Sequence, residues 1–226
     1  MARPAPDTTR PTAVAVLDEA VCALAPDAGA NRLVARIGAG QAPRSVFATF
    51  ALEQHQVIAA DRLSFRHLAR RADGDPPVAD FFDLLARGET LALERLAGLA
   101  DACALTARDL AGYQPRPGCQ AYPSYAARLA LGAQPADVAI ALTANFAAWG
   151  GYCAVVEAAM RDHYGFPEAA RGFFGLFAEP APDVEEQARA AVQHGLDTGQ
   201  AQPAAAHRYG RLLQAYELMF WNSVDG

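Results

Sequence analysis

The long stretches between proline- and glycine-rich breaks are the feature that most restricts how this chain can fold. Within them apolar residues recur every three or four positions, and most stretches are too long to be β-strands. Neither an internal repeat nor a linker divides the chain. We therefore expect an all-α fold, one multi-helix bundle over residues 12–226, after a disordered tail at 1–11. The predicted helices span 12–25, 31–37, 43–72, 78–86, 90–110, 124–131, 135–164, 167–178, 183–196 and 203–224, and 112–123 is expected to be a loop.

Charge and cysteine usage indicate the setting in which such a domain works. The formal net charge is −6, and all 19 basic residues are arginines that form no dense stripe, which argues against a nucleic-acid partner. No secretion signal opens the chain and no charge-free apolar run of membrane-spanning length is expected, so we predict a cytoplasmic protein with no membrane partner. No two cysteines form a C-x-x-C pair, which favours reduced thiols over a zinc or redox motif. These cysteines are Cys22, Cys103, Cys119 and Cys153.

Three segments, in order along the chain, carry a resemblance to a known family. In residues 31–54 a glycine turn and a proline precede two phenylalanines and a Glu-Gln pair. The second segment begins at Tyr125 and leads into a helix that contains Trp149 and Tyr152. The third is residues 216–221, Tyr-Glu-Leu-Met-Phe-Trp. Together these segments resemble the TenA/Thi-4 family of thiaminase II-like proteins, which shares its fold with heme oxygenase.

The resemblance implies a reaction and a set of roles. In that family an aminopyrimidine is hydrolysed with release of ammonia or a thiazole. A cysteine is the nucleophile, a late glutamate handles protons, an aspartate holds the pyrimidine, and aromatic residues shape the pocket. The heme-oxygenase-like bundle of this family also forms dimers and tetramers, so a homodimer or homotetramer is expected.

Glu217 matches the late glutamate and is predicted to be the catalytic acid or base. It stands among apolar and aromatic neighbours, so burial of this helix face would raise its pKa and suit it to proton transfer. The alternative is a solvent-facing glutamate on an amphipathic helix. Phe220, one turn later, would stack against a ligand.

The remaining binding residues follow from the same resemblance. Gln54 stands where the family has its pyrimidine-holding aspartate, and an amide bonds a heterocycle without the charge of a carboxylate. Val57 replaces a pocket tyrosine, which makes that wall more apolar. Tyr125 matches a mid-chain tyrosine, for which a structural role is equally open. The predicted substrate-binding residues are Phe50, Gln54, Tyr125, Trp149, Tyr152, Phe177 and Phe220.

The nucleophile of the family has no counterpart at its expected position. Counting from Trp149 places Ala147 there, and counting from Tyr125 places Ala148 there. Cys153 lies almost two turns further along the same helix. Since alanine cannot attack a ring, the covalent route is not supported, and a water would have to replace the thiol.

Other chemistries lack their usual sequence patterns. There is no Glu-x-x-His pair of the kind that helical di-iron sites use, and no glycine-rich phosphate loop follows a strand. We predict no cofactor and no metal site.

The sequence thus predicts a TenA-like protein that acts on or binds a thiamin-related aminopyrimidine or a similar flat heterocycle as its small-molecule ligand. Whether it is an enzyme stays open. The first alternative is a non-catalytic ligand-binding or regulatory protein, since this family has long been labelled as transcriptional regulators. A lesser alternative is a di-iron or cofactorless oxidase of the same fold.

Overall fold

Most helices in this chain begin in one of two ways. Either a side chain accepts a hydrogen bond from a free backbone N–H group of the first turn, or the first turn contains a proline, which has no backbone N–H. The Thr12 and Asn31 side chains accept hydrogen bonds from the first turns of their helices, and Thr106 and Asp109 form a capping box. Five further helices carry proline in their first turn, where its missing N–H costs nothing. These local signals explain where most of the helices begin.

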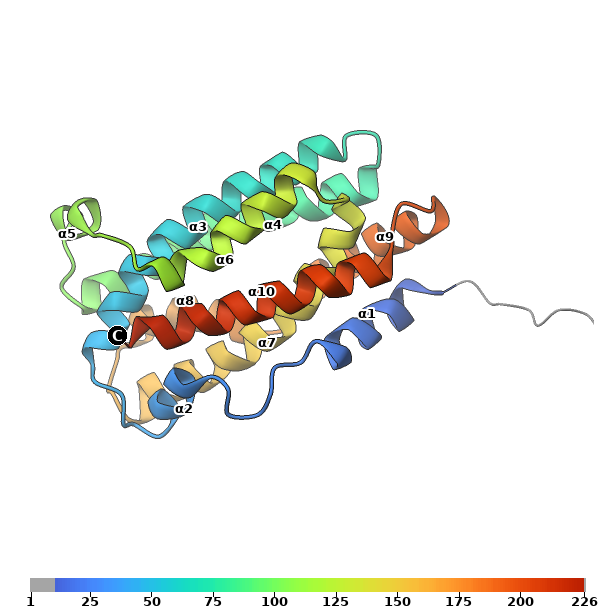
Figure 1. Cartoon of the computed structure of the whole chain (residues 1–226). Coiled ribbons are helices and arrows are strands. Elements are labelled where there is room, and N and C mark those ends of the chain that lie inside the picture. The colour runs from blue at the N-terminus through green and yellow to red at the C-terminus, as the bar shows by residue number, and fades with distance from the viewer. Residues whose placement is uncertain (1–10, 226) are drawn as a thin grey trace, which may run out of the picture.

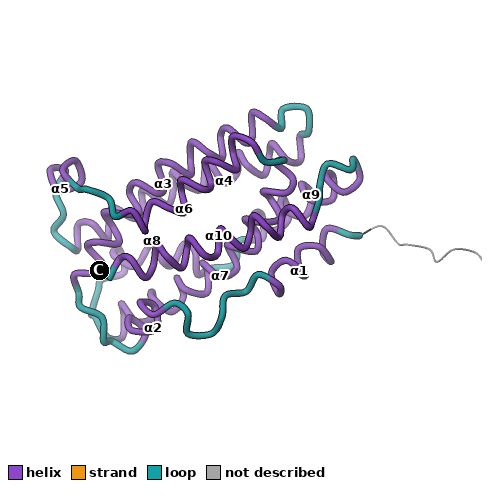
Figure 2. Tube along the Cα trace, viewed as in Figure 1, coloured by secondary structure: helices purple, strands orange, loops and turns teal. Residues whose placement is uncertain are grey.

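The computed structural model describes residues 11–225 and confirms the all-α prediction (Figures 1 and 2). No strand occurs in that range. The predicted tail at 1–11 lies outside the described residues apart from its last position. The helices are α1 (Ala13–Ala23), α2 (Arg32–Gly38), α3 (Ser45–Arg71), α4 (Pro76–Ala102), α5 (Ala107–Gly112), α6 (Pro117–Gly132), α7 (Pro135–Asp162), α8 (Glu168–Ala178), α9 (Pro182–Asp197) and α10 (Pro203–Val224).

Two predicted breaks are wrong. The pair 78–86 and 90–110 is the single helix α4, which ends at Ala102; Gly88 costs about 1 kcal/mol relative to alanine in a helix, and packing of α4 on its neighbours offsets that cost. The loop expected at 112–123 ends earlier, because α6 already begins at Pro117 and continues through Pro123. This second correction adds almost two turns to the start of α6.

Six helices close a ring. Helix α3 packs against α4 and α6, α6 against α10, α10 against α7, α7 against α8, and α8 returns to α4. Helix α2 lies outside this ring against α7 and α10, α1 packs against α7 and α9, and α9 also covers α4 (Figure 1). Because the ring is closed, its interior is walled on every side by a helix.

Helix α7 corrects the expectation about apolar runs. An 18-residue window of α7 is long and apolar enough to cross a membrane by length and composition, with a mean hydropathy of 1.4. In the structure α7 packs against α1, α2, α8, α9 and α10. That position is typical of the core helix of a soluble protein.

The apolar core is divided into two clusters. The first cluster contains residues of α1, α9, the first half of α7, the C-terminal part of α3 and the N-terminal part of α4. The second cluster contains residues of α2, α8, the end of α7 and the last turns of α10. Tyr122 packs against both clusters. The middle of the ring, between the clusters, is therefore where polar side chains can collect.

A buried carboxylate ties the segment between α5 and α6 to the ring. Glu53 of α3 is 0% exposed and accepts hydrogen bonds from the Tyr113 hydroxyl at 2.7 Å, the Arg116 backbone N–H at 2.7 Å and the Gln120 amide at 2.9 Å. Arg116 in turn donates to the carbonyl of Val224 at 2.9 Å. One side chain thereby fixes the connection that leads into α6.

We expect Glu53→Ala to lower the free energy of unfolding by about 3 kcal/mol, because it leaves buried donors without an acceptor. Chemical denaturation measures this change. The matched control is Glu94→Ala on the exposed face of α4, which should change stability by less than about 0.5 kcal/mol. Equal effects of the two variants would contradict a special role for Glu53.

Candidate functional site

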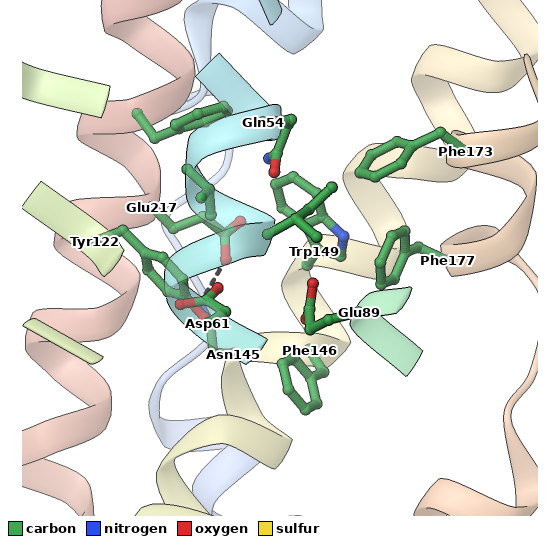
Figure 3. Close-up of a pocket in the computed structure, with 13 residues that line it drawn as sticks. Gln54, Asp61, Glu89, Tyr122, Asn145, Phe146, Trp149, Phe173, Phe177 and Glu217 are labelled. Carbon is green, nitrogen blue, oxygen red and sulfur yellow. Dashed lines mark hydrogen bonds between the residues drawn. The ribbon is translucent and has the colours of Figure 1, made fainter. Parts of the chain in front are cut away.

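Every helix of the ring contributes side chains to one internal cavity of about 50 Å³ (Figure 3). The cavity combines carboxyl, amide and phenol groups with a wall of aromatic rings. Its lining residues are Gln54, Val57, Ile58, Asp61, Glu89, Tyr122, Asn145, Phe146, Trp149, Phe173, Phe177, Glu217 and Phe220.

Helical periodicity explains why these residues meet. Helix α3 supplies Gln54 and Asp61, seven residues apart on one face, with Val57 and Ile58 between them. Helices α7, α8 and α10 likewise each give residues three or four positions apart. One face of each helix thus enters the cavity.

Glu217 is held so that one carboxyl oxygen remains free. The side chain is 3% exposed, and the Asn145 amide donates to its Oε2 at 2.5 Å. Its Oε1 is buried without a hydrogen-bond partner. Burial raises the pKa of the Glu217 carboxyl to about 8, against the lowering effects of the neighbouring Asn145 and Trp221 side chains. At neutral pH this group is therefore mostly protonated and able to donate.

A second acidic group, Asp61, lies near Glu217, Tyr122 and Asn145 in the cavity (Figure 3). Burial raises the pKa of Asp61 to about 8, and its Oδ1 is also buried without a partner. Burial, and then the charge of Asp61, raises the pKa of Glu89 well above its usual range. The Tyr122 pKa is raised by burial and by the charges of Asp61, Glu217 and Glu89, so its phenol stays neutral among them. The cavity thus carries three carboxyl groups around one hydroxyl.

The opposite wall is aromatic. Trp149 stands edge-on to Phe177 with ring centroids 5.9 Å apart, and Phe173 lies 5.1 Å from Phe177. Phe220 completes this wall one turn after Glu217. Such faces suit a flat ring held by stacking and edge contacts.

The structure brings five of the eight predicted site residues to the cavity: Gln54, Trp149, Phe177, Glu217 and Phe220. Phe50 lies behind the wall, stacked on Trp221 at 5.2 Å. Tyr152 also packs on Trp221, at 6.0 Å. These two support the lining and do not form it.

Tyr125 does not line the cavity. Its ring packs edge-on against Tyr216 at 5.3 Å, in the cluster that includes the first half of α7. Tyr122, one turn earlier on α6, lines the cavity in its place. Tyr122 was not predicted as a site residue because it fell within the expected loop 112–123, whereas α6 in fact begins at Pro117.

Several lining residues were missed by sequence reasoning. Asp61, Asn145 and Phe173 each lie three to seven residues from a predicted site residue on the same helix, so helical spacing could have found them. Glu89 had no such signal, because it was placed in a predicted break between two helices.

The described chain offers no thiol to the cavity. Cys153 is 0% exposed in the core, and burial raises its pKa well above the usual range. Cys119, also buried, has its pKa raised to about 12. Ala147 lines a separate groove on the outside of the helix ring, between α1, α4, α7, α8 and α9. Over residues 11–225 no three His, Cys, Asp or Glu side chains are grouped as a metal ion would require.

Comparison with known proteins identifies a similar fold but no similar sequence. No protein-family model and no curated protein matches the sequence. Among solved structures, the chain is similar to the TenA homologue protein from P. horikoshii OT3, with a TM-score of 0.65, 16% sequence identity, and coverage of 94% of this chain and 93% of that chain. At this identity the likeness is one of fold. The chain therefore shares the all-α fold of this TenA homologue over nearly its whole length.

Proposed function

We propose that the chain binds a thiamin-related aminopyrimidine, or a similar flat nitrogen heterocycle, and acts on it through Glu217. The observation that carries the proposal is the free Oε1 of a buried, raised-pKa carboxyl group opposite an aromatic wall. The ligand class itself comes from the sequence resemblance to the TenA/Thi-4 family, and the fold shared with a TenA homologue is consistent with it.

The polar groups complement the edge of such a ring. An aminopyrimidine presents an amino donor beside a ring-nitrogen acceptor, and a protonated carboxyl presents a donor beside an acceptor. Glu217 offers that pair, with Asn145 fixing its orientation. Gln54 adds an amide that both donates and accepts, and Trp149 and Phe220 offer ring faces.

In the catalytic form of the proposal, water performs the attack. With aminomethyl-pyrimidine as the substrate, water adds to the carbon that carries the leaving amine, the C–N bond breaks, and Glu217 gives its proton to that amine. The carboxylate then takes the proton released by water, which restores the acid. No thiol is needed, in keeping with Ala147 and Ala148 at the positions where the family has its cysteine.

The second candidate is a non-catalytic binding or regulatory protein. It is favoured by one observation, that no cysteine among residues 11–225 lines the cavity. By resemblance we also propose a cytoplasmic homodimer or homotetramer with no nucleic-acid or membrane partner.

The first test is hydrolysis of thiamin and of aminomethyl-pyrimidine, followed by product release. We expect Glu217→Gln to lower turnover at least ~100-fold, because a neutral amide holds the ligand but transfers no proton. Glu94→Gln, on the exposed face of α4, serves as the control and should keep full activity.

The outcomes separate the two candidates. Turnover that is lost in Glu217→Gln supports the hydrolase. Binding without turnover, weakened by the same variant, supports the binding protein. If neither compound is turned over and neither binds, the proposal is rejected.

Stability should depend on pH through Glu217. Its folded pKa of about 8 lies above its usual 4.5, so the folded state holds the proton more tightly than the unfolded state. Stability is therefore full below about pH 4.5 and is lost as the pH rises toward 8, by on the order of 4 kcal/mol for this group. Denaturation at pH 5 and pH 9 measures the loss, and Glu217→Gln should reduce it. An unchanged pH dependence in that variant would place Glu217 in solvent.

A further inference from the structure

A larger groove opens beside the cavity. This outer groove has a volume of about 630 Å³ and is lined by α1, α4, α7, α8 and α9. It shares four lining residues with the cavity: Glu89, Phe146, Trp149 and Phe177. The two spaces therefore meet at this boundary.

The walls of the outer groove are mainly apolar. Val14 of α1 is 52% exposed and Leu91 of α4 is 38% exposed, and both side chains line the groove. On α7 the groove floor is made of small residues, Ala147, Gly150 and Gly151, which leave it deep. Exposed charged residues, among them Asp18 and Arg189, also line it.

The volumes of the cavity and the outer groove limit the size of ligand that each can hold. Ligand sites usually measure about 300–1,000 Å³, so the cavity of about 50 Å³ holds only a small group and the outer groove falls within the usual range. A ligand of ordinary size that reaches Glu217 must therefore extend past Glu89 and Trp149 into the groove.

We propose that the cavity and the outer groove form one site for a two-part ligand: a compact, donor-rich nitrogen head and an apolar tail of several carbons. The head lies among Asp61, Glu89 and Glu217. Asp61 Oδ1 and Glu217 Oε1 are buried without a partner, and nitrogen groups of the head can complete their hydrogen bonds. The tail covers Val14 and Leu91. This inference rests on the proposed function for its head and goes beyond it for its tail.

Continuity with the cavity favours a ligand over a protein surface as the occupant. A hydrocarbon tail that enters from the cavity would place its head on unpartnered carboxyl oxygens and its carbons on apolar walls in the same event. A second copy of the chain would cover the groove rim and leave these oxygens unpaired.

The test uses 4-amino-2-methylpyrimidine with methyl, butyl or octyl at C5, with binding measured by quenching of the two tryptophans. Each buried methylene should tighten binding about fourfold, so the butyl compound should bind at least ~10-fold tighter than the methyl compound. Leu91→Asp and Val14→Asp, on opposite walls, should abolish that gain. Leu131→Asp, at a 72% exposed leucine outside the groove, should keep it.

The outcomes are distinct from those of the proposed function. If the methyl compound binds, weakens in Glu217→Gln and shows no gain with tail length, the head site stands and the tail proposal is overturned. Absence of binding by all three compounds overturns both. If Leu91→Asp converts an oligomer into monomers in sedimentation, the groove is an interface between copies and the tail proposal is overturned.

Discussion

Burial of the Asp61 and Glu217 carboxyl groups, beside the half-buried Glu89, inside a closed ring of helices is the constraint on which the site depends. A charged carboxylate away from water is costly unless it is paired, so these groups shift toward their neutral forms. For Asp61 and Glu217 the pKa reaches about 8. The two apolar clusters pack on either side of the carboxyl groups, and the ring between them keeps a small polar cavity.

Two buried glutamates show how hydrogen bonding separates structure from function. Glu53 accepts three hydrogen bonds and fixes the approach to α6. Glu217 accepts one close hydrogen bond, from Asn145, and keeps Oε1 without a partner. A carboxylate whose oxygens both accept hydrogen bonds within the protein has no oxygen available to a ligand. A carboxyl group that faces a cavity with one oxygen unpartnered can form its missing hydrogen bond with a ligand. Helical periodicity does not distinguish them, because both stand on amphipathic helices; only the family-like motif around Glu217 singles it out.

Helical periodicity was enough to predict the fold, because apolar spacing and proline starts are local. It failed at Gly88 and Pro123, where contacts with other helices keep the chain helical against local preference. The site was predicted where residues share a helix turn with a family-like motif, as Glu217 and Phe220 do. Glu89 comes from a stretch without such a motif, and only the closing of the ring brings it to Asp61.

The resemblance places the family's nucleophile at Ala147 or Ala148, and the first of these alanines also bears on the geometry. Ala147 lines the outer groove together with Gly150 and Gly151, so the missing side chains create room beside the cavity. Asn145, half a turn earlier on α7, faces Glu217 and orients its carboxyl group. Helix α7 thus provides space toward the groove and a hydrogen-bond donor to Glu217 toward the cavity. A site of this kind selects a ligand by shape and by exchangeable protons, because the described chain offers it no thiol with which to form a covalent bond.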